Sequence, residues 1–159
     1  MKKIWLLFLL VLTNIVMSNQ LHQAARENNI QRVQELLQDP SIDVNAVDEL
    51  GTTPLYVASE HGYTNVVRLL LEKGASIDKV DQYGYTPLWI ASSRGRAEIV
   101  SILLKNHAEI DKAADNGATP LYAASCSGHA EVVSLLLAER EAIHKAAEPS
   151  VTPLDGCSK

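Results

Sequence analysis

A repeat of 33 residues is the dominant feature of the sequence. The segment 84–116 matches the segment 51–83 at 14 of 33 positions and the segment 117–149 at 17 of 33, without a gap. Twelve positions are identical in all three copies. A fixed period of this length is typical of a solenoid, in which each unit buries its apolar face only against its neighbours. We therefore expect a solenoid.

Each copy begins with the signals for a helix. Thr-Pro-Leu opens the copies at 53–55, 86–88 and 119–121. The Thr hydroxyl can accept from an unpaired backbone N–H, and Pro suits the first helical position because the N–H that it lacks would be unpaired there. A glycine then marks the end of this helix, where a turn favours a positive φ. These glycines are Gly62, Gly95 and Gly128.

A second helix follows in each copy. In the first full copy it carries the apolar segments 66–67 and 69–71, whose spacing places them on one side of a helix. Gly74 ends this helix. A buried isoleucine and a tight Asp-x-x-Gly turn then lead into the next copy. The isoleucines are Ile77, Ile110 and Ile143.

The order of helix, turn, helix and β-turn every 33 residues, opening on Thr-Pro-Leu, resembles the ankyrin repeat. The resemblance runs from Leu21 to Leu154. It implies an all-α ankyrin-repeat solenoid. The expected units are an N-terminal capping repeat at 19–50, ankyrin repeats at 51–83, 84–116 and 117–149, and a partial repeat or C-terminal tail at 150–159.

Three of the units depart from the pattern at glycine positions. Asn28 stands in the capping repeat where the other units have the first glycine. His107 and Arg140 stand at the position of Gly74. If these positions are left-handed, a residue other than glycine costs on the order of 1 kcal/mol. Arg140→Gly is therefore expected to stabilise the last repeat.

The N-terminus has the pattern of a secretory signal. Lys2 and Lys3 precede an apolar run from Ile4 to about Met17, and Ser18 is a small residue at a plausible cleavage site. The run has about 14 residues, whereas a membrane-spanning helix needs roughly 20. We expect residues 1–18 to be removed as a signal peptide, so that the chain begins near Asn19. The alternative is a membrane anchor at 4–17.

Charge and cysteine usage narrow the function classes. Without Lys2 and Lys3 the chain has 12 basic and 19 acidic residues, a net charge of −7, and no basic cluster. Nucleic-acid binding needs clustered positive charge, so it is not expected. Cys126 and Cys157 lie in neighbouring units, two residues out of register. Stacked helices are about 8–10 Å apart and a disulfide needs Cα atoms within roughly 7 Å, so we expect free thiols.

No arrangement of residues indicates catalysis. The five histidines fall at different phases of the repeat and show no close ligand spacing. No Ser, His and acid recur in the arrangement of a nucleophile and its base, and no Gly-rich loop could cradle a phosphate. We expect no enzyme activity, no catalytic residue, no metal, no cofactor and no small-molecule substrate.

Binding is the remaining function, and the resemblance implies where it occurs. Ankyrin-like proteins generally use the β-turn tips and the exposed end of the first helix, which line a concave groove. The tips correspond to Glu49, Leu50, Thr52, Gln82, Tyr83, Tyr85, Asp115, Asn116 and Ala118. The helix ends correspond to Glu60, His61, Ser93, Arg94, Cys126 and Ser127.

Aromatic residues suggest the centre of that surface. Tyr83 and Tyr85 flank Gly84 at one tip, and exposed tyrosines favour contact with a partner. The alternative is that they pack along their own hairpin. Replacing both is expected to weaken binding and barely change the melting temperature. A second set of aromatic residues follows Thr-Pro-Leu, where ankyrin-like repeats commonly carry His, and we expect it to pack between repeats. Its members are Tyr56, Trp89 and Tyr122.

The favoured hypothesis is an exported binding module that acts as a monomeric adaptor or inhibitor of another protein, secreted or periplasmic. Such a protein could serve a bacterium or be directed towards a host. A membrane-tethered scaffold with residues 4–17 retained is the first alternative. A truncated fragment of a longer array is the second, since the motif restarts at 150–154 and then stops.

Overall fold

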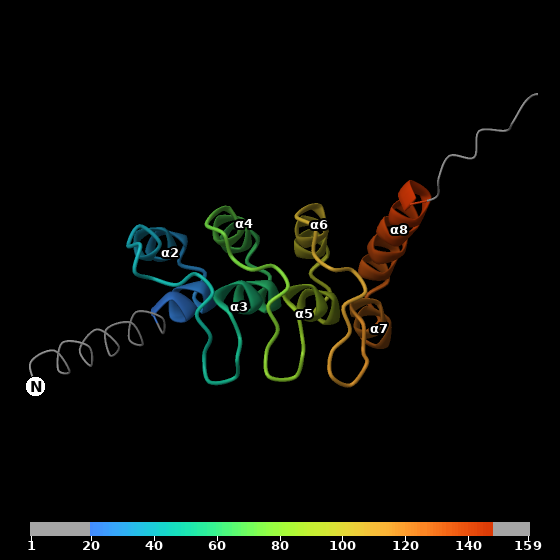
Figure 1. Cartoon of the computed structure of the whole chain (residues 1–159), viewed down its shortest axis with the longest axis horizontal. Coiled ribbons are helices and arrows are strands. Elements are labelled where there is room, and N and C mark those ends of the chain that lie inside the picture. The colour runs from blue at the N-terminus through green and yellow to red at the C-terminus, as the bar shows by residue number, and fades with distance from the viewer. Residues whose placement is uncertain (1–19, 148–159) are drawn as a thin grey trace, which may run out of the picture.

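The computed structural model describes residues 20–147. The predicted signal peptide at 1–18 and the partial repeat at 150–159 lie outside the described residues. The helices form pairs along the chain (Figure 1). These are a helix at 20–26 with α2 (Ile30–Leu36), α3 (Pro54–His61) with α4 (Thr64–Glu72), α5 (Pro87–Ser93) with α6 (Ala97–Lys105), and α7 (Pro120–Cys126) with α8 (Ala130–Ala147).

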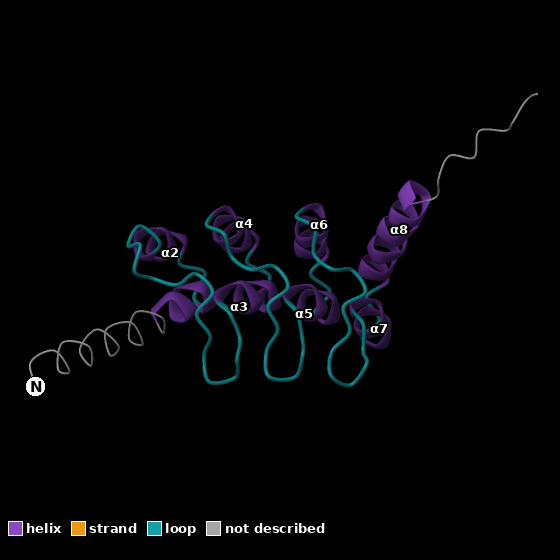
Figure 2. Ribbon diagram, in the orientation of Figure 1, coloured by secondary structure: helices purple, strands orange, loops and turns teal. Residues whose placement is uncertain are grey.

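The pairs build two layers. The helices α3, α5 and α7 pack side by side as an inner layer, and α2, α4, α6 and α8 form an outer layer. Hairpin loops project from the inner layer on the side away from the outer helices (Figure 1). We call them finger 1 (48–52), finger 2 (81–85) and finger 3 (114–118). Residues 20–147 contain helices and loops but no strand (Figure 2), so the expected all-α solenoid is confirmed.

The start of each inner helix follows from its first residues. At Thr53, Thr86 and Thr119 the hydroxyl accepts a hydrogen bond from the backbone N–H three residues later, at 3.0–3.2 Å. Pro occupies the first helical position in α3, α5 and α7. At the end of α3, Gly62 has a φ of 87° and its N–H donates to the carbonyl of Ala58. The predicted caps are therefore confirmed.

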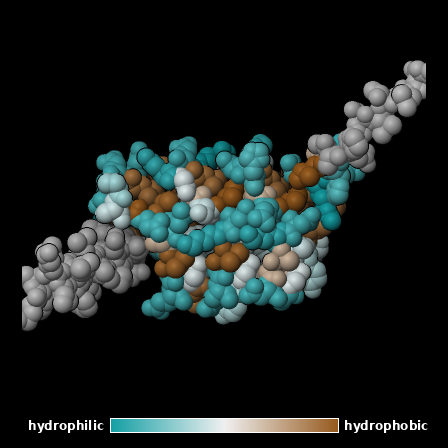
Figure 3. All heavy atoms as spheres, viewed as in Figure 1, coloured by the Kyte–Doolittle hydropathy of each residue, from teal (hydrophilic) through white to brown (hydrophobic). Residues whose placement is uncertain are grey.

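The core lies between the two layers. Leu55, Leu88 and Ala91 of the inner helices are completely buried, as are Val66 and Leu70 of α4. The space-filling view shows apolar residues in bands between the polar outer-helix edge and the polar fingers (Figure 3). Each unit therefore buries its apolar stripe against its neighbours, as the repeat predicts.

The left-handed positions were predicted only in part. Asn28 has a φ of 56° and His107 a φ of 66°, so both stand in left-handed turns that glycine occupies in other repeats. Arg140 does not, because α8 continues through it to Ala147. The expectation of a left-handed Arg140 is wrong. Residues 138–147 are rich in Ala and Glu, which favour a helix, and no glycine interrupts them.

The extension of α8 also changes the environment of one predicted core residue. Ile77 and Ile110 are partly buried and pack against the core, as expected. Ile143 stands at the same position of the third full repeat, but it lies on the helix and is 49% exposed. The prediction that Ile143 is buried is wrong, because the loop that would turn it inward is replaced by helix.

Candidate partner-binding groove

The fingers are rigid hairpins that are hydrogen-bonded to one another. In each finger the first residue donates its backbone N–H to the carbonyl of the last, at 3.0–3.1 Å. Neighbouring tips are also joined, since Gln82 N donates to the Leu50 carbonyl and Asp115 N to the Tyr83 carbonyl, both at 3.1 Å. The three tips therefore form one continuous edge.

A carboxylate closes finger 1 from inside. Asp48 accepts from the backbone N–H groups of Leu50 and Thr52 and from the Thr52 hydroxyl, at 2.7–3.0 Å. Partial burial opposes the charged form, but the bonds from Thr52 and Leu50 outweigh it and hold the pKa of Asp48 below its ordinary value. Asp81 accepts from Tyr83 N and Tyr85 N in finger 2, each at 2.9 Å.

Finger 3 reaches the same shape with a neutral side chain. It has Ala114 at the position of Asp48 and Asp81. Its turn is closed by Asn116, whose side-chain oxygen accepts from Ala118 N at 3.0 Å. The Asn116 amide nitrogen also lies 3.5 Å from the Tyr85 hydroxyl. A hairpin of this type therefore needs a side-chain acceptor, but not a charge.

The first helix and α5 each hold the next finger through a side-chain hydrogen bond. His22 Nε2 donates to the Thr52 carbonyl at 2.9 Å, and Trp89 Nε1 donates to the Ala118 carbonyl at 3.1 Å. Tyr56, between them in the series, is buried beside Asp81. Burial, together with the nearby negative charges of Asp81 and Glu60, raises its pKa.

The expectation that this aromatic series packs between repeats therefore holds for Tyr56 and Trp89. It fails for Tyr122, whose side chain is 61% exposed. No later finger lies among residues 20–147 to cover it. His22 occupies the same position of the first unit, and its alignment with Tyr56 and Trp89 could have identified it from the sequence.

The tyrosines of finger 2 differ from each other. Tyr85 stacks on Trp89 with ring centroids 3.9 Å apart and an interplanar angle of 26°. Tyr83 lies 6.0 Å from Tyr85 and is 57% exposed. Tyr85 therefore belongs largely to the packing of the hairpin on α5, which was the alternative considered for both residues. Tyr83 keeps most of its surface free.

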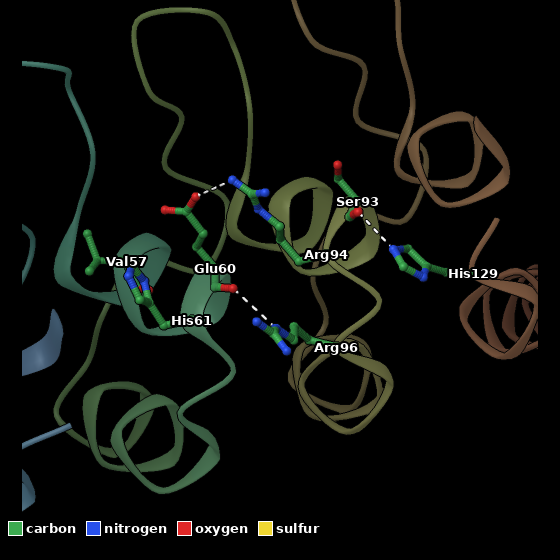
Figure 4. Close-up of polar contacts among 7 residues, drawn as sticks. All are labelled: Val57, Glu60, His61, Ser93, Arg94, Arg96 and His129. Atoms are coloured by element: carbon green, nitrogen blue, oxygen red, sulfur yellow. Dashed lines mark hydrogen bonds and ion pairs between the residues drawn. The ribbon is translucent and has the colours of Figure 1, made fainter. Parts of the chain in front are cut away.

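The ends of the inner helices are tied to the following repeat (Figure 4). Arg96 Nε donates to the Glu60 carbonyl at 3.2 Å, and His129 Nε2 donates to the Ser93 carbonyl at 3.0 Å. These bonds satisfy carbonyls that a helix leaves unpaired at its C-terminus. Arg94 also forms an ion pair with the Glu60 carboxylate at 2.7 Å. The helix ends thus form a fixed second wall opposite the fingers.

A groove lies between the fingers and the helix ends. Its volume is about 290 Å³, and it involves fingers 1 and 2, α3, α5 and the first helix. Six of the predicted binding residues line it: Leu50, Thr52, Glu60, Tyr83, Tyr85 and Arg94. Seven other residues complete it: Arg26, Asp48, Tyr56, Val57, Asp81, Trp89 and Ile90.

Two of the predicted binding residues are buried, and nine of them lie outside this groove. Thr52 and Ala118 were expected to point outward, but their side chains are only 7% and 9% exposed, so that expectation is wrong. Their carbonyls accept hydrogen bonds from the side chains of His22 and Trp89. The residues that are not part of the groove lining are Glu49, His61, Gln82, Ser93, Asp115, Asn116, Ala118, Cys126 and Ser127.

Sequence reasoning missed one basic residue of the groove. Arg26 ends the first helix at the position that Glu60, Ser93 and Cys126 occupy in later repeats. The first unit lacks Thr-Pro-Leu, so this motif does not mark where its first helix begins and ends. The alignment of the repeats contains the signal that would have found it.

Metal-binding and membrane-spanning features are absent from the described part of the chain, residues 20–147. Residues 20–147 contain no group of three or more His, Cys, Asp or Glu side chains placed to hold a metal ion. Within that range no helix combines the length and the apolar character needed to cross a membrane. Cys126 is an exposed free thiol, as expected, and Cys157 lies outside the described residues.

Paired helices in two layers, with a hairpin finger before each of the last three pairs, define the class of helical-repeat solenoids. The family model described as ankyrin repeats (3 copies) matches residues 21–114 and 77–148. The chain belongs to the ankyrin repeat family. Proteins of this kind are generally non-enzymatic modules for protein–protein interaction. A search of curated proteins finds no match.

Proposed function

We propose that the chain binds a partner protein in the groove between fingers 1 and 2 and the inner helices. The observation that supports this best is the pair Leu50 and Tyr83. They occupy the same position of neighbouring fingers, line the same groove, and are 55% and 57% exposed. Aromatic anchors such as Tyr83 usually carry much of an interface's energy, and a rigid backbone lowers the entropy cost of binding.

The role that follows is that of an adaptor or inhibitor. The groove presents the apolar side chains of Leu50 and Tyr83 on the finger side and the charged side chains of Glu60 and Arg94 at the helix ends. Such a surface can hold or block another protein but supplies no chemistry of its own. The binding unit is a monomer in this proposal, because the described repeats build the groove within one chain.

The test is a quantitative capture of partners with the full chain and two variants. Leu50→Ala/Tyr83→Ala removes the apolar pair from the groove. Leu137→Ala is the control, because Leu137 is also an exposed leucine but lies on α8, away from the groove. We expect proteins captured by the parent to be lost with the groove variant and kept with the control. Equal capture by all three would refute the groove, provided that the melting temperatures agree.

Export is a separate part of the proposal. It is supported by Lys2 and Lys3, the short apolar run and Ser18 in the sequence. We expect intact-mass spectrometry of the mature protein to place its first residue at or near Asn19. Recovery of the full 17.4 kDa chain from a membrane fraction would favour the tethered alternative instead.

A further inference from the structure

We infer that the groove selects an extended segment that combines a carboxylate with a neighbouring apolar side chain. This inference deepens the proposed function and rests on it. The carboxylate is bound by Arg26 at the helix side of the groove. The apolar side chain packs against Leu50 and Tyr83 at the finger side.

Each acidic residue of the groove already has a partner within the chain. Asp48 already accepts three hydrogen bonds from finger 1, and Asp81 accepts two backbone N–H groups in finger 2. Glu60 is engaged by Arg94 at 2.7 Å. A basic ligand would have to compete with these internal partners. The net negative charge of the chain is thus a poor guide to what this groove binds.

Arg26, in contrast to these acidic residues, has side-chain donors that are free to bind a ligand. It is exposed and lines the groove, and its side chain makes no hydrogen bond or ion pair within residues 20–147. A guanidinium presents five N–H donors in a planar fork that matches a carboxylate. Such charge-assisted bonds are roughly twice as strong as neutral ones. The unused donors of the groove therefore favour an anionic group.

The residues on the finger side of the groove favour an apolar side chain in the ligand. Leu50 and Tyr83 project from tips that are fixed to each other through the bond from Gln82 N to the Leu50 carbonyl. Val57 and Ile90 of the inner helices also line the groove, with the stacked pair of Tyr85 and Trp89 beside them. An aliphatic or aromatic side chain placed there loses contact with water on several sides.

The size of the groove decides the form of the ligand. A volume of about 290 Å³ accommodates a few side chains and is too small for a domain to enter. Both walls belong to this one space, so a short segment can reach Arg26 and Tyr83 together. We therefore commit to an extended acidic and apolar segment.

The probe is a phage-displayed library of linear peptides with eight random residues, selected on the full chain. We expect enriched peptides to carry Asp or Glu within a few positions of Leu, Phe, Tyr or Trp. Arg26→Ala should weaken binding of such a peptide by about tenfold. Replacing the peptide's Glu by Gln should weaken its binding to the parent chain by a similar factor. The same replacement should barely change its binding to the Arg26→Ala variant. Arg26→Lys should keep part of the preference for acid.

Arg68→Ala is the matched control, because Arg68 is an exposed arginine on the outer helix α4. It should leave peptide affinity unchanged. Tyr83→Ala should instead remove the preference for apolar residues while the preference for acid persists. Binding should also weaken as salt is raised from 0.05 to 0.5 M, by screening of the exposed charges.

Each other outcome overturns the inference in a distinguishable way. Enrichment of Lys or Arg, or of apolar peptides without acid that still need Leu50 and Tyr83, refutes the carboxylate but keeps the groove. Peptides whose affinity is unchanged by Arg26→Ala, Leu50→Ala and Tyr83→Ala refute the groove as well. Failure to enrich any peptide refutes an extended ligand, and the capture experiment then decides the proposed function independently.

Discussion

Trp89 donates its indole N–H to the carbonyl of Ala118 across 3.1 Å, and this bond links α5 to the base of finger 3. The same carbonyl also accepts from Ala114 N at 3.0 Å, so it keeps one partner if the indole is lost. The bond has a counterpart in the first unit, from His22 to Thr52. In the first unit and at α5, one side chain thus ties the stack together by reaching the next finger.

Trp89→Phe is expected to lower the free energy of unfolding by about 1–2 kcal/mol. It removes one hydrogen bond and part of a packed ring without leaving the carbonyl unpaired. Urea denaturation monitored by circular dichroism measures the effect. Tyr122→Phe is the control, since Tyr122 holds the same position of the last full repeat but is largely exposed. A loss as large in the control would show that the bond to Ala118 is unimportant.

Tyr85→Ala and Tyr83→Ala should separate stability from binding. Tyr85 is half-buried and stacks on Trp89 at 3.9 Å, so its removal is expected to cost about 1–3 kcal/mol. Tyr83 is exposed, and its removal should change stability by less than about 0.5 kcal/mol. Thermal melts of the two single variants test this difference. Equal melting temperatures would contradict it. The double replacement should now lower the melting temperature, contrary to the expectation from sequence.

The two positions that correspond to Gly74 should respond oppositely to glycine. His107 has a φ of 66°, and His107→Gly should stabilise by about 1 kcal/mol. Arg140 is inside α8, where Arg140→Gly should destabilise by about 1 kcal/mol and also break the ion pair with Asp111. The urea midpoints of both variants show whether each substitution stabilises or destabilises the protein. Stabilisation by Arg140→Gly would mean that α8 ends earlier than Ala147.

Finger 1 should carry an acid-dependent share of the stability. The pKa of folded Asp48 is lowered from its ordinary value of 3.8, so its stabilising effect is complete above that value and disappears as pH falls through the lower folded pKa. Asp48→Asn should therefore cost most at neutral pH and progressively less below about pH 4. Unfolding free energies between pH 7 and pH 2.5 test this expectation.

Asn116→Ala provides the comparison for finger 3. The Asn116 amide does not titrate, so the cost of removing it should be the same at every pH at which the protein folds. A cost of Asp48→Asn that is equally independent of pH would show that the carboxylate charge is not what stabilises finger 1.

The parts of the fold that depend on local signals were predictable from the sequence. The helix caps at Thr53, Thr86 and Thr119 involve residues three apart, and the turn at Gly62 needs only its own φ. The extent of α8 was harder to predict from the sequence. The expectation of a loop after Leu137 rested on repeat register, whereas the helix propensity of residues 138–147 determines the structure there.

The site was predictable in outline only. The finger tips and helix ends follow from the repeat, and they place Leu50 and Tyr83 correctly on the exposed edge. The packing of Tyr85 on Trp89 did not follow, because it depends on how finger 2 folds over the start of α5. The burial of Thr52 also did not follow from the sequence, because it depends on how finger 1 packs against the first helix, where His22 donates to the Thr52 carbonyl.

The most direct test of the groove is to ask which residues touch the partner. The photoreactive analogue p-benzoylphenylalanine is placed at position 83 in one sample and at position 137 in another, and each is irradiated with the captured partner. We predict a covalent adduct from position 83 and none from position 137. An adduct from position 137 alone would place the partner on α8 and contradict the groove between fingers 1 and 2.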